Sequence, residues 1–323
     1  MKAWIYRRYG GPEVLEWAER PDPAPGRGEL GVKVVAASVN PLDWKLPAGE
    51  FRLMTLGRLP RGLGFDVAGV VDAVGEGVSG WRAGEAVVAI ANPITSRLGT
   101  FAERCCVPAA NAVRKPEALA FVDAAALPGS GITAVQALAE AGLAAGQRVL
   151  VLGASGGVGS FAVQLARIAG ASVPAVAGAA AQAHLATRGA ERCLDRSRED
   201  WRALAERFDI VFDCSGVSTL AEGRRVLAPA GAYAQILPNA RFWFGAQWLR
   251  LTSRQRCILV MEKPNGEDLA TLVGLAASGR LRAPVTRIAA MGEVPAVIGA
   301  MRAGHNQGKT VIRAEPGDRS TLP

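Results

Sequence analysis

Closely spaced glycines follow an apolar run in the middle of the chain, an order that is typical of phosphate-binding sites. Residues 149–152 are all apolar, and residues 153–159 read GASGGVG. Glycine lets backbone N–H groups approach a pyrophosphate, and the positive end of a following helix stabilises its charge. The core, Ala154-x-Gly156-x-x-Gly159, is the dinucleotide fingerprint with alanine at its first glycine. We predict that the cofactor binds Ala154, Ser155, Gly156, Gly157, Val158 and Gly159.

The residues after the next expected strand, 172–177, decide between NADH and NADPH. An acid at the end of that strand would bind the ribose hydroxyls of NAD, but Ala177 and Gly178 stand there. The strand expected after it, 192–196, ends at Arg196. A guanidinium pairs well with a 2′-phosphate, although a solvated surface arginine is the alternative. These residues favour NADPH.

The elements that position this loop alternate along the chain. Residues 1–115 read as short strands and turns, including 28–40, 66–78 and 85–90. From residue 116, apolar strands alternate with helices expected at 157–169, 180–188 and 218–227, which predicts a parallel sheet with helices on both faces. Near residue 284 the short strands return. We expect one domain from residues 1–115 and 285–323, and a second from residues 116–284.

Composition excludes several classes of protein. The 323 residues carry five cysteines without a CxxC pair, which argues against a disulfide framework and a thiolate metal site. The formal charge of +8 comes from scattered arginines with few aromatics, so nucleic acid is not an expected partner. Residues 149–166 are uncharged, but glycines interrupt them, so we expect no membrane span. The start lacks a signal-peptide core, and a reducing cytoplasm is the expected compartment.

Several motifs in a fixed order carry a resemblance to a known family. They are MKAWIYRRYGGPEVLE, SVNPLDWKLPAG, LGFDVAGVVDAVGEGV, GTFAERCCVP, AAALPGSGITAVQAL, GASGGVGSFAVQLA, DCSG and GKTVI. With them the chain resembles the zinc-free quinone oxidoreductase branch of the medium-chain dehydrogenases/reductases. The resemblance implies an α/β protein with a GroES-like β-barrel catalytic domain, built from both chain ends, and a Rossmann doubly wound parallel-sheet domain. It also implies a nicotinamide cleft between the two, with Cys214 and Ser215 of DCSG at the cofactor.

The same resemblance locates the positions that bind zinc in other members of the family. They hold Asn40, the pair Phe65-Asp66 and about Gly129 in this chain. The chain has only two histidines, His184 and His305. Because a catalytic zinc needs about three N, S or O ligands close together, we expect no metal.

Without zinc to polarise a carbonyl, acceptors that are already electron-poor remain. We therefore predict a zinc-independent NADPH-dependent oxidoreductase that transfers hydride to a quinone or an α,β-unsaturated carbonyl. A non-catalytic NADPH-binding protein of the same fold, a crystallin or a sensor, is the alternative, because it needs the same cofactor loop.

Three residues are the expected catalytic groups, and each has a plainer interpretation. The Asn40 amide can donate to a carbonyl or to the nicotinamide ribose, or Asn40 is a turn residue before Pro41. Lys45 resembles a lysine of the oxoene reductases, or it is a solvent-facing charge. Thr133 matches the family's nicotinamide-side threonine, or it lies at a helix N-terminus.

The substrate pocket is expected to contain Asp43, Phe65 and Phe242, although Asp43 could simply orient its loop. Phe242 belongs to an aromatic cluster with Trp243, Phe244 and Trp248. This cluster could cover a flat acceptor, support a dimer interface or pack in the core. The stretch RCILVM, 256–261, resembles the family's dimerising strand, so we expect a homodimer. No tyrosine stands in the Asn40 loop, and no proton donor is assigned.

Overall fold

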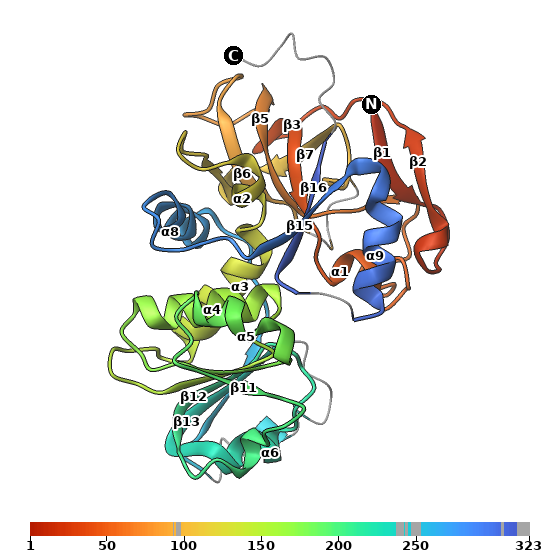
Figure 1. Ribbon diagram of the computed structural model, residues 1–323. Helices are drawn as coiled ribbons and strands as arrows, with labels where there is room; N and C mark the ends of the chain where they lie inside the picture. Colours follow the sequence, from red (N-terminus) through yellow and green to blue (C-terminus); the bar gives the residue numbers. More distant parts are fainter. Residues whose placement is uncertain are drawn as a thin grey trace. The chain divides into compact units, whose positions relative to one another are not determined.

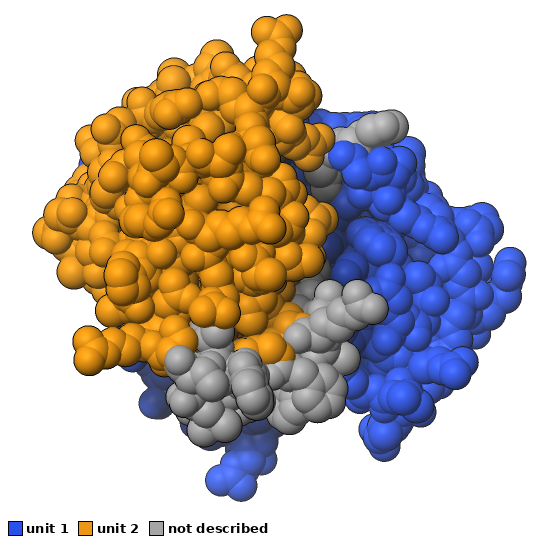
Figure 2. All heavy atoms as spheres, turned by 90° about the horizontal axis from the view of Figure 1, so that it is seen from below, with its two compact units in different colours: residues 1–129, 264–279, 285–323 blue, residues 130–263, 280–284 orange. Residues whose placement is uncertain are grey.

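A computed structural model describes residues 1–92, 94, 98–236, 242, 245–246, 253–304 and 307–314. Three of the four clustered aromatics, Trp243, Phe244 and Trp248, lie outside the described residues, as does His305. The chain divides into two compact units, coloured in Figure 2. Unit 1 comprises residues 1–129, 264–279 and 285–323, and unit 2 comprises residues 130–263 and 280–284.

These units differ from the expected domains at two places. Residues 116–129 belong to unit 1, because helix α2 (Phe121–Ala125) packs on strands of that unit. Residues 264–279 also belong to unit 1, because helix α8 (Gly266–Ala277) contacts its strand β8. Helix α8 was not expected from the sequence, although Asn265 caps it and buried Leu269 and Leu272 follow at helical spacing.

Unit 1 is mainly antiparallel β-structure (Figure 1). One sheet has the order β15-β16-β3-β5-β6-β8, with β7 also paired to β3, and a smaller sheet has the order β2-β1-β4. The strands are β1 (Lys2–Tyr6), β2 (Leu15–Glu19), β3 (Glu29–Ser38), β4 (Arg61–Gly62), β5 (Asp66–Val74), β6 (Ala86–Ile90), β7 (Arg104–Pro108), β8 (Ala112–Arg114), β15 (Val285–Ala290) and β16 (Lys309–Arg313). Its helices, besides α2 and α8, are α1 (Leu42–Lys45) and α9 (Val294–Arg302). Short 3₁₀ turns cover Pro12–Val14, Ala109–Asn111 and Met291–Glu293.

The two long strands β3 and β5 form the centre of unit 1. They run antiparallel, with Ser38 at the end of β3 opposite Asp66 at the start of β5. Strand β16, from the far end of the chain, pairs with this same end of β3. Their apolar side chains supply much of a core in which Leu30, Val32 and Val67 are fully buried. The pairing therefore brings the ends of three distant segments together.

Unit 2 is a parallel sheet of six strands in the order β11-β10-β9-β12-β13-β14. The strands are β9 (Val149–Leu152), β10 (Pro174–Ala177), β11 (Arg192–Asp195), β12 (Phe208–Asp213), β13 (Leu227–Ile236) and β14 (Arg256–Val260). The helices are α3 (Pro128–Glu140), whose first two residues belong to unit 1, α4 (Gly157–Ile168), α5 (Gln182–Ala186) and α6 (Leu220–Val226). Turns of 3₁₀ helix cover Ala179–Ala181 and Trp201–Ala203. This is the doubly wound Rossmann order.

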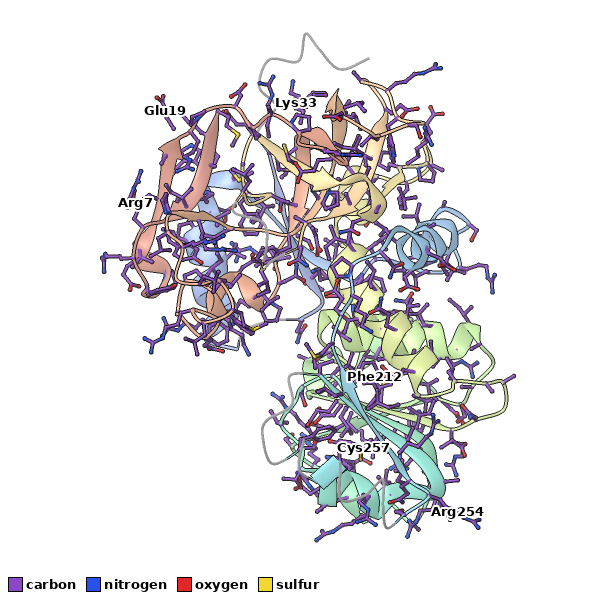
Figure 3. All side chains as sticks on the ribbon, turned by 180° about the vertical axis from the view of Figure 1, so that it is seen from behind. Arg7, Glu19, Lys33, Phe212, Arg254 and Cys257 are labelled. Atoms are coloured by element: carbon purple, nitrogen blue, oxygen red, sulfur yellow. The ribbon has the colours of Figure 1, made fainter. Side chains whose placement is uncertain are left out.

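Helices cover both faces of this sheet, with α4 and α5 on one side and α6 on the other (Figure 1). Phe212 of β12 and Cys257 of β14, both labelled in Figure 3, point to opposite faces, because Cys257 aligns with Tyr233 and Tyr233 with Val211. Within the described residues, every helix is too short or too polar to cross a lipid bilayer.

Candidate functional site

The glycine-rich loop lies between β9 and α4, as predicted. Gly153 turns the chain with a φ of +70°, which glycine adopts without strain. Gly156 then caps α4 without a side-chain hydrogen bond, and the first turn of α4 contains no acid. The protein's own side chains therefore leave the positive end of this helix available to an anion.

Two glycines of the loop serve different purposes. A Cβ on Gly159 would lie 2.5 Å from the Gly153 carbonyl oxygen and 2.6 Å from the Ala154 Cα. The close packing of α4 on the turn therefore requires glycine there. A Cβ on Gly156 would meet nothing nearer than the Gly153 oxygen at 3.6 Å, an ordinary contact. Packing does not require glycine at 156, which is consistent with open backbone facing a ligand.

The loops after β9 and β12 meet where the strand order reverses, the usual ligand position in such sheets. The Cys214 N–H donates to the Leu152 carbonyl oxygen at 3.0 Å. A Cβ on Gly153 would come within 2.9 Å of the Ser215 Cβ. Burial and the neighbouring Asp213 raise the pKa of the Cys214 thiol. The predicted cofactor residues Cys214 and Ser215 thus lie beside the glycine-rich loop.

Asp213, which the sequence analysis did not select, organises the loop after β12. Its fully buried carboxylate accepts hydrogen bonds from the backbone N–H groups of Ser215, Gly216 and Ser218. The Ser215 hydroxyl and the Gln235 amide also donate to it. The signal available in the sequence was an acid that directly follows the apolar run 210–212 at the end of the strand.

At the end of β10, the structure brings Gly178 and Arg196 together. The Arg196 N–H donates to the Ala177 carbonyl oxygen at 2.9 Å, which extends the pairing of β11 with β10. The Nε of Arg196 lies 3.9 Å from the position that a Cβ would take on Gly178. The Arg196 side chain is exposed, and Ala177 is buried. A guanidinium therefore lies beside the position at which an NAD-specific fold would place an acid.

Thr133 lies within α3 and not at its N-terminus. Its hydroxyl donates a long hydrogen bond of 3.5 Å to the Glu262 carboxylate. The helix-capping interpretation of Thr133 is therefore wrong.

Asn40 stands in a buried polar network of unit 1, just beyond β3. Its Nδ2 donates to the Asp66 carboxylate at 2.9 Å, and its Oδ1 accepts from the Lys309 ammonium at 2.7 Å. Lys309 also donates to Asp66 at 3.2 Å, and the Ser38 hydroxyl donates to the same carboxylate oxygen at 2.5 Å. The other Asp66 oxygen accepts the Gly129 N–H at 2.9 Å. Sequence reasoning missed Lys309, which is 243 residues from Asp66.

Asp43 organises the loop that carries Asn40. It is fully buried, and its carboxylate accepts the N–H of Asn40 at 2.7 Å and that of Gly64 at 2.9 Å. Burial raises the pKa of this carboxyl to about 7. These contacts match the loop-orienting alternative, and the place of Asp43 in a substrate pocket stays a prediction.

The other two residues predicted from this part of the chain are also largely covered. Lys45, at the end of α1, has a side chain that is only 17% exposed. Its ammonium lies 3.7 Å from the Glu50 carboxylate and over the Trp44 ring. Lys45 is therefore partly covered, and its role at the site stays a prediction. Phe65 is buried immediately before β5.

Phe242 packs in the core of unit 2 and not on its surface. It is 4% exposed, and its ring centroid lies 5.9 Å from that of Tyr233. The packing interpretation of Phe242 therefore has direct support, while its place in a substrate pocket stays a prediction.

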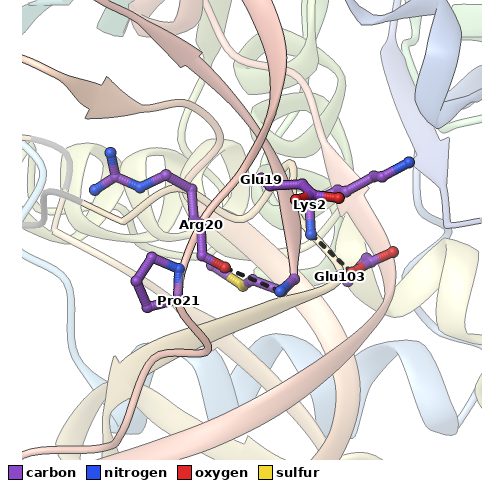
Figure 4. A pocket seen from close by; sticks show the side chains of 6 residues that line it. Lys2, Glu19, Arg20, Pro21 and Glu103 are labelled. Atoms are coloured by element: carbon purple, nitrogen blue, oxygen red, sulfur yellow. Dashed lines mark hydrogen bonds between the residues drawn. The ribbon is translucent and has the colours of Figure 1, made fainter.

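A surface hollow of about 570 Å³ lies elsewhere in unit 1, beside the first strand (Figure 4). Its lining contains none of the predicted site residues and mixes Lys2 and Arg20 with Glu19 and Glu103. We therefore assign it no part in the chemistry.

The network around Asp66 does not fit a metal ion. Of the residues at the expected zinc positions, only Asp66 has a carboxylate, and both of its oxygens already accept hydrogen bonds. The Lys309 ammonium, 3.2 Å from that carboxylate, would repel a second cation. In the described part of the chain, no group of three or more His, Cys, Asp and Glu side chains could hold a metal.

Comparison with known proteins decides the family. The model of the alcohol dehydrogenase GroES-like domain matches residues 26–117, and that of the zinc-binding dehydrogenases matches residues 188–312. A chloroplast envelope quinone oxidoreductase homologue of Arabidopsis thaliana is 32% identical over 97% of this chain and 98% of its own length. The chain belongs to the quinone oxidoreductase-like branch of the medium-chain dehydrogenases/reductases.

Two further similarities agree with this membership. The structure of a quinone oxidoreductase from Coxiella burnetii superimposes with a TM-score of 0.90 at 31% identity, covering 97% of this chain and 99% of that one. An NADPH-dependent alkenal/one oxidoreductase of A. thaliana is 35% identical over 75% of this chain, which spans 65% of that relative. The predicted fold class is confirmed, and this medium-chain dehydrogenase/reductase is an oxidoreductase of a pyridine nucleotide-binding family.

Proposed function

We propose that the protein reduces quinones or α,β-unsaturated carbonyl compounds with NADPH and without a metal ion. The observation that carries this proposal is the buried Asp66–Lys309 pair, in which the ammonium lies 3.2 Å from the one carboxylate at the expected zinc positions and would repel a metal ion there. Relatives named quinone oxidoreductase and NADPH-dependent alkenal/one oxidoreductase support the choice of acceptor.

The residues of unit 2 fit NADPH. The uncapped N-terminus of α4 would bind the pyrophosphate, with Gly156 offering open backbone. Arg196, beside Gly178, would pair with the 2′-phosphate. When bound, NADPH supplies the hydride.

The expected acceptors follow from the chemistry available without a Lewis acid. Quinones and enones are electron-poor, and hydride addition gives a hydroquinone anion or an enolate. The protein then has to hold the acceptor in place and donate hydrogen bonds to the developing oxyanion. We assign the donor role to the Asn40 amide, and supporting roles at the reacting end to Lys45 and Thr133.

The assembly and compartment follow from other features. Strand β14 ends the six-stranded order of unit 2, and pairing of this strand with a second copy would form a homodimer. All five cysteines are unpaired, which suits a reducing compartment such as the cytoplasm.

The test is the loss of reduced-nicotinamide absorbance by the purified protein. NADPH and NADH would be offered in parallel, each with a small quinone and a small enone. We expect turnover that prefers NADPH, and the faster acceptor identifies the substrate class. Tight NADPH binding without turnover on any quinone or enone would overturn the proposal in favour of a binding protein.

A further inference from the structure

The Lys309 ammonium lies at the end of β3, and each of its three N–H groups donates a hydrogen bond. It donates to the Val39 carbonyl oxygen at 3.2 Å, to Asn40 Oδ1 at 2.7 Å and to Asp66 Oδ2 at 3.2 Å. An ammonium has three N–H donors and no acceptor, so these contacts use all three. The Lys309 side chain is 2% exposed and that of Asp66 is 0% exposed. Water therefore cannot replace these partners at low cost.

This arrangement permits only one orientation of the Asn40 amide. Lysine can only donate, so it must face Oδ1, and a carboxylate can only accept, so Asp66 must face Nδ2. Rotating the amide by half a turn would set Nδ2 against the ammonium and Oδ1 against the carboxylate. Both contacts would become repulsive in a buried site.

One hydrogen on Nδ2 remains only weakly engaged. Asp66 takes the first at 2.9 Å, while the second has the Ser38 carbonyl oxygen at 3.4 Å, near the limit of a hydrogen bond. That second N–H is the one that a ligand oxygen could capture without breaking the contacts to Lys309 and Asp66.

We infer that Lys309 is a positioning residue, which together with Asp66 fixes Asn40 as a hydrogen-bond donor to substrate or cofactor. The inference rests on the proposed function, because the proposed acceptors develop negative charge on oxygen and need a donor there. Lys309 acts through Asn40 and touches no reacting atom. An unanchored amide would present its oxygen for part of the time, and that oxygen would repel the oxyanion.

A double-mutant cycle between Lys309→Met and Asn40→Ala tests this on kcat. We expect Lys309→Met alone to lower kcat by about 10- to 100-fold. In the Asn40→Ala background the same change should lower kcat by less than about twofold, because the amide through which Lys309 acts is absent. Additive losses, or an unchanged kcat for Lys309→Met, would overturn the inference. Lys115→Met is the matched control, because that ammonium also donates to backbone carbonyls but contacts no site residue.

Lys309→Met leaves Asp66 without its counter-ion and could fail to fold. The neutral pair Asp66→Asn with Lys309→Met then replaces it in the same cycle, with the same expected and contradicting results.

A readout without turnover separates this inference from the proposed function. In ¹H–¹⁵N spectra, assigned with Asn40→Ala, we expect two well-separated, slowly exchanging Asn40 Nδ2 protons in the wild-type protein. In the neutral pair the chemical shifts of these two protons should approach each other, and the protons should exchange faster. A mobile amide in the wild-type protein overturns the inference, whereas an ordered amide in an inactive protein overturns the proposed function alone.

Discussion

The guanidinium of Arg196 lies beside Gly178, with its Nε 3.9 Å from the position that a Cβ would occupy. A cation and an open backbone thus share the end of β10, where a carboxylate would select NAD. This relationship is the basis for the expected preference for NADPH.

Replacing Arg196 should lower the affinity for NADPH and leave the affinity for NADH unchanged. If its guanidinium pairs with the 2′-phosphate, Arg196→Ala weakens NADPH binding by about 1–3 kcal/mol and leaves NADH binding unchanged. Fluorescence titration of both cofactors measures this. Arg198→Ala is the control, since that side chain is 84% exposed and reaches Asp195 only at 3.8 Å. Equal losses for NADPH and NADH would remove Arg196 from the phosphate site.

An acid at position 178 should reverse the preference. The backbone there is extended, with φ −74° and ψ 157°, so any residue is tolerated. In Gly178→Asp the carboxylate would repel the 2′-phosphate and pair with Arg196. We expect NADPH affinity to fall by about tenfold or more and NADH affinity to hold or rise. Gly178→Asn introduces a side chain of equal size without a charge, and should change the ratio of NADPH affinity to NADH affinity much less. An unaltered ratio in the aspartate variant would contradict the assignment.

Two alanine variants of the glycine-rich loop should separate binding from folding. The methyl group added in Gly156→Ala would meet no clash within the protein, so the midpoint of thermal unfolding should stay unchanged. Both cofactors should nevertheless bind about tenfold or more weakly. Gly159→Ala would clash with backbone atoms at 2.5 and 2.6 Å, and should lower the free energy of unfolding by about 1–3 kcal/mol. Thermal melts with cofactor titrations measure both. Normal binding by Gly156→Ala would mean that this loop does not contact the pyrophosphate.

Asp43 should make the protein less stable as the pH rises from about 4 to about 7. Its folded-state pKa of about 7 exceeds the usual value of 3.8, so in this window the folded protein keeps a proton that the unfolded chain has lost. The free energy of unfolding therefore falls with pH, by at most about 4 kcal/mol, and levels off above pH 7. Urea unfolding at pH 5 and pH 8 measures the difference between the two conditions.

Asp43→Asn isolates this contribution from those of other groups. The variant cannot titrate at position 43, so its stability should change less between the two pH values than that of the wild-type protein. It should also be less stable at pH 5, because one of the two backbone N–H groups would face an amide donor. An identical pH dependence in both proteins would show that Asp43 does not titrate in this range.

The sequence predicted best those features that local patterns determine. The apolar strand, the turn and the helix around Gly156 are contiguous, and the structure has β9 and α4 where they were expected. Helix α5 is shorter than the predicted 180–188, because residues 179–181 form a 3₁₀ turn before it. Phe242 stood in an aromatic cluster, and only tertiary packing shows it against Tyr233.

The hydrogen-bond network around Lys309 could not be predicted from local sequence patterns. It joins segments that are 243 and 269 residues apart, and neither Lys309 nor Asp66 stands in a local pattern that predicts burial. A charged residue at a strand end is usually solvated. Only the pairing of β3 with both β5 and β16 brings these charges to Asn40 and removes them from water.

Metal-free reduction is tested most directly by the turnover of protein stripped of metal with a chelator, with its metal content measured by atomic emission. NADPH and the better of the two acceptors would be supplied to stripped, untreated and zinc-supplemented samples. We predict the same kcat in all three samples, because the Lys309 ammonium beside Asp66 would repel a metal ion there. Activity that disappears on stripping and returns with one equivalent of zinc would contradict the metal-free reduction.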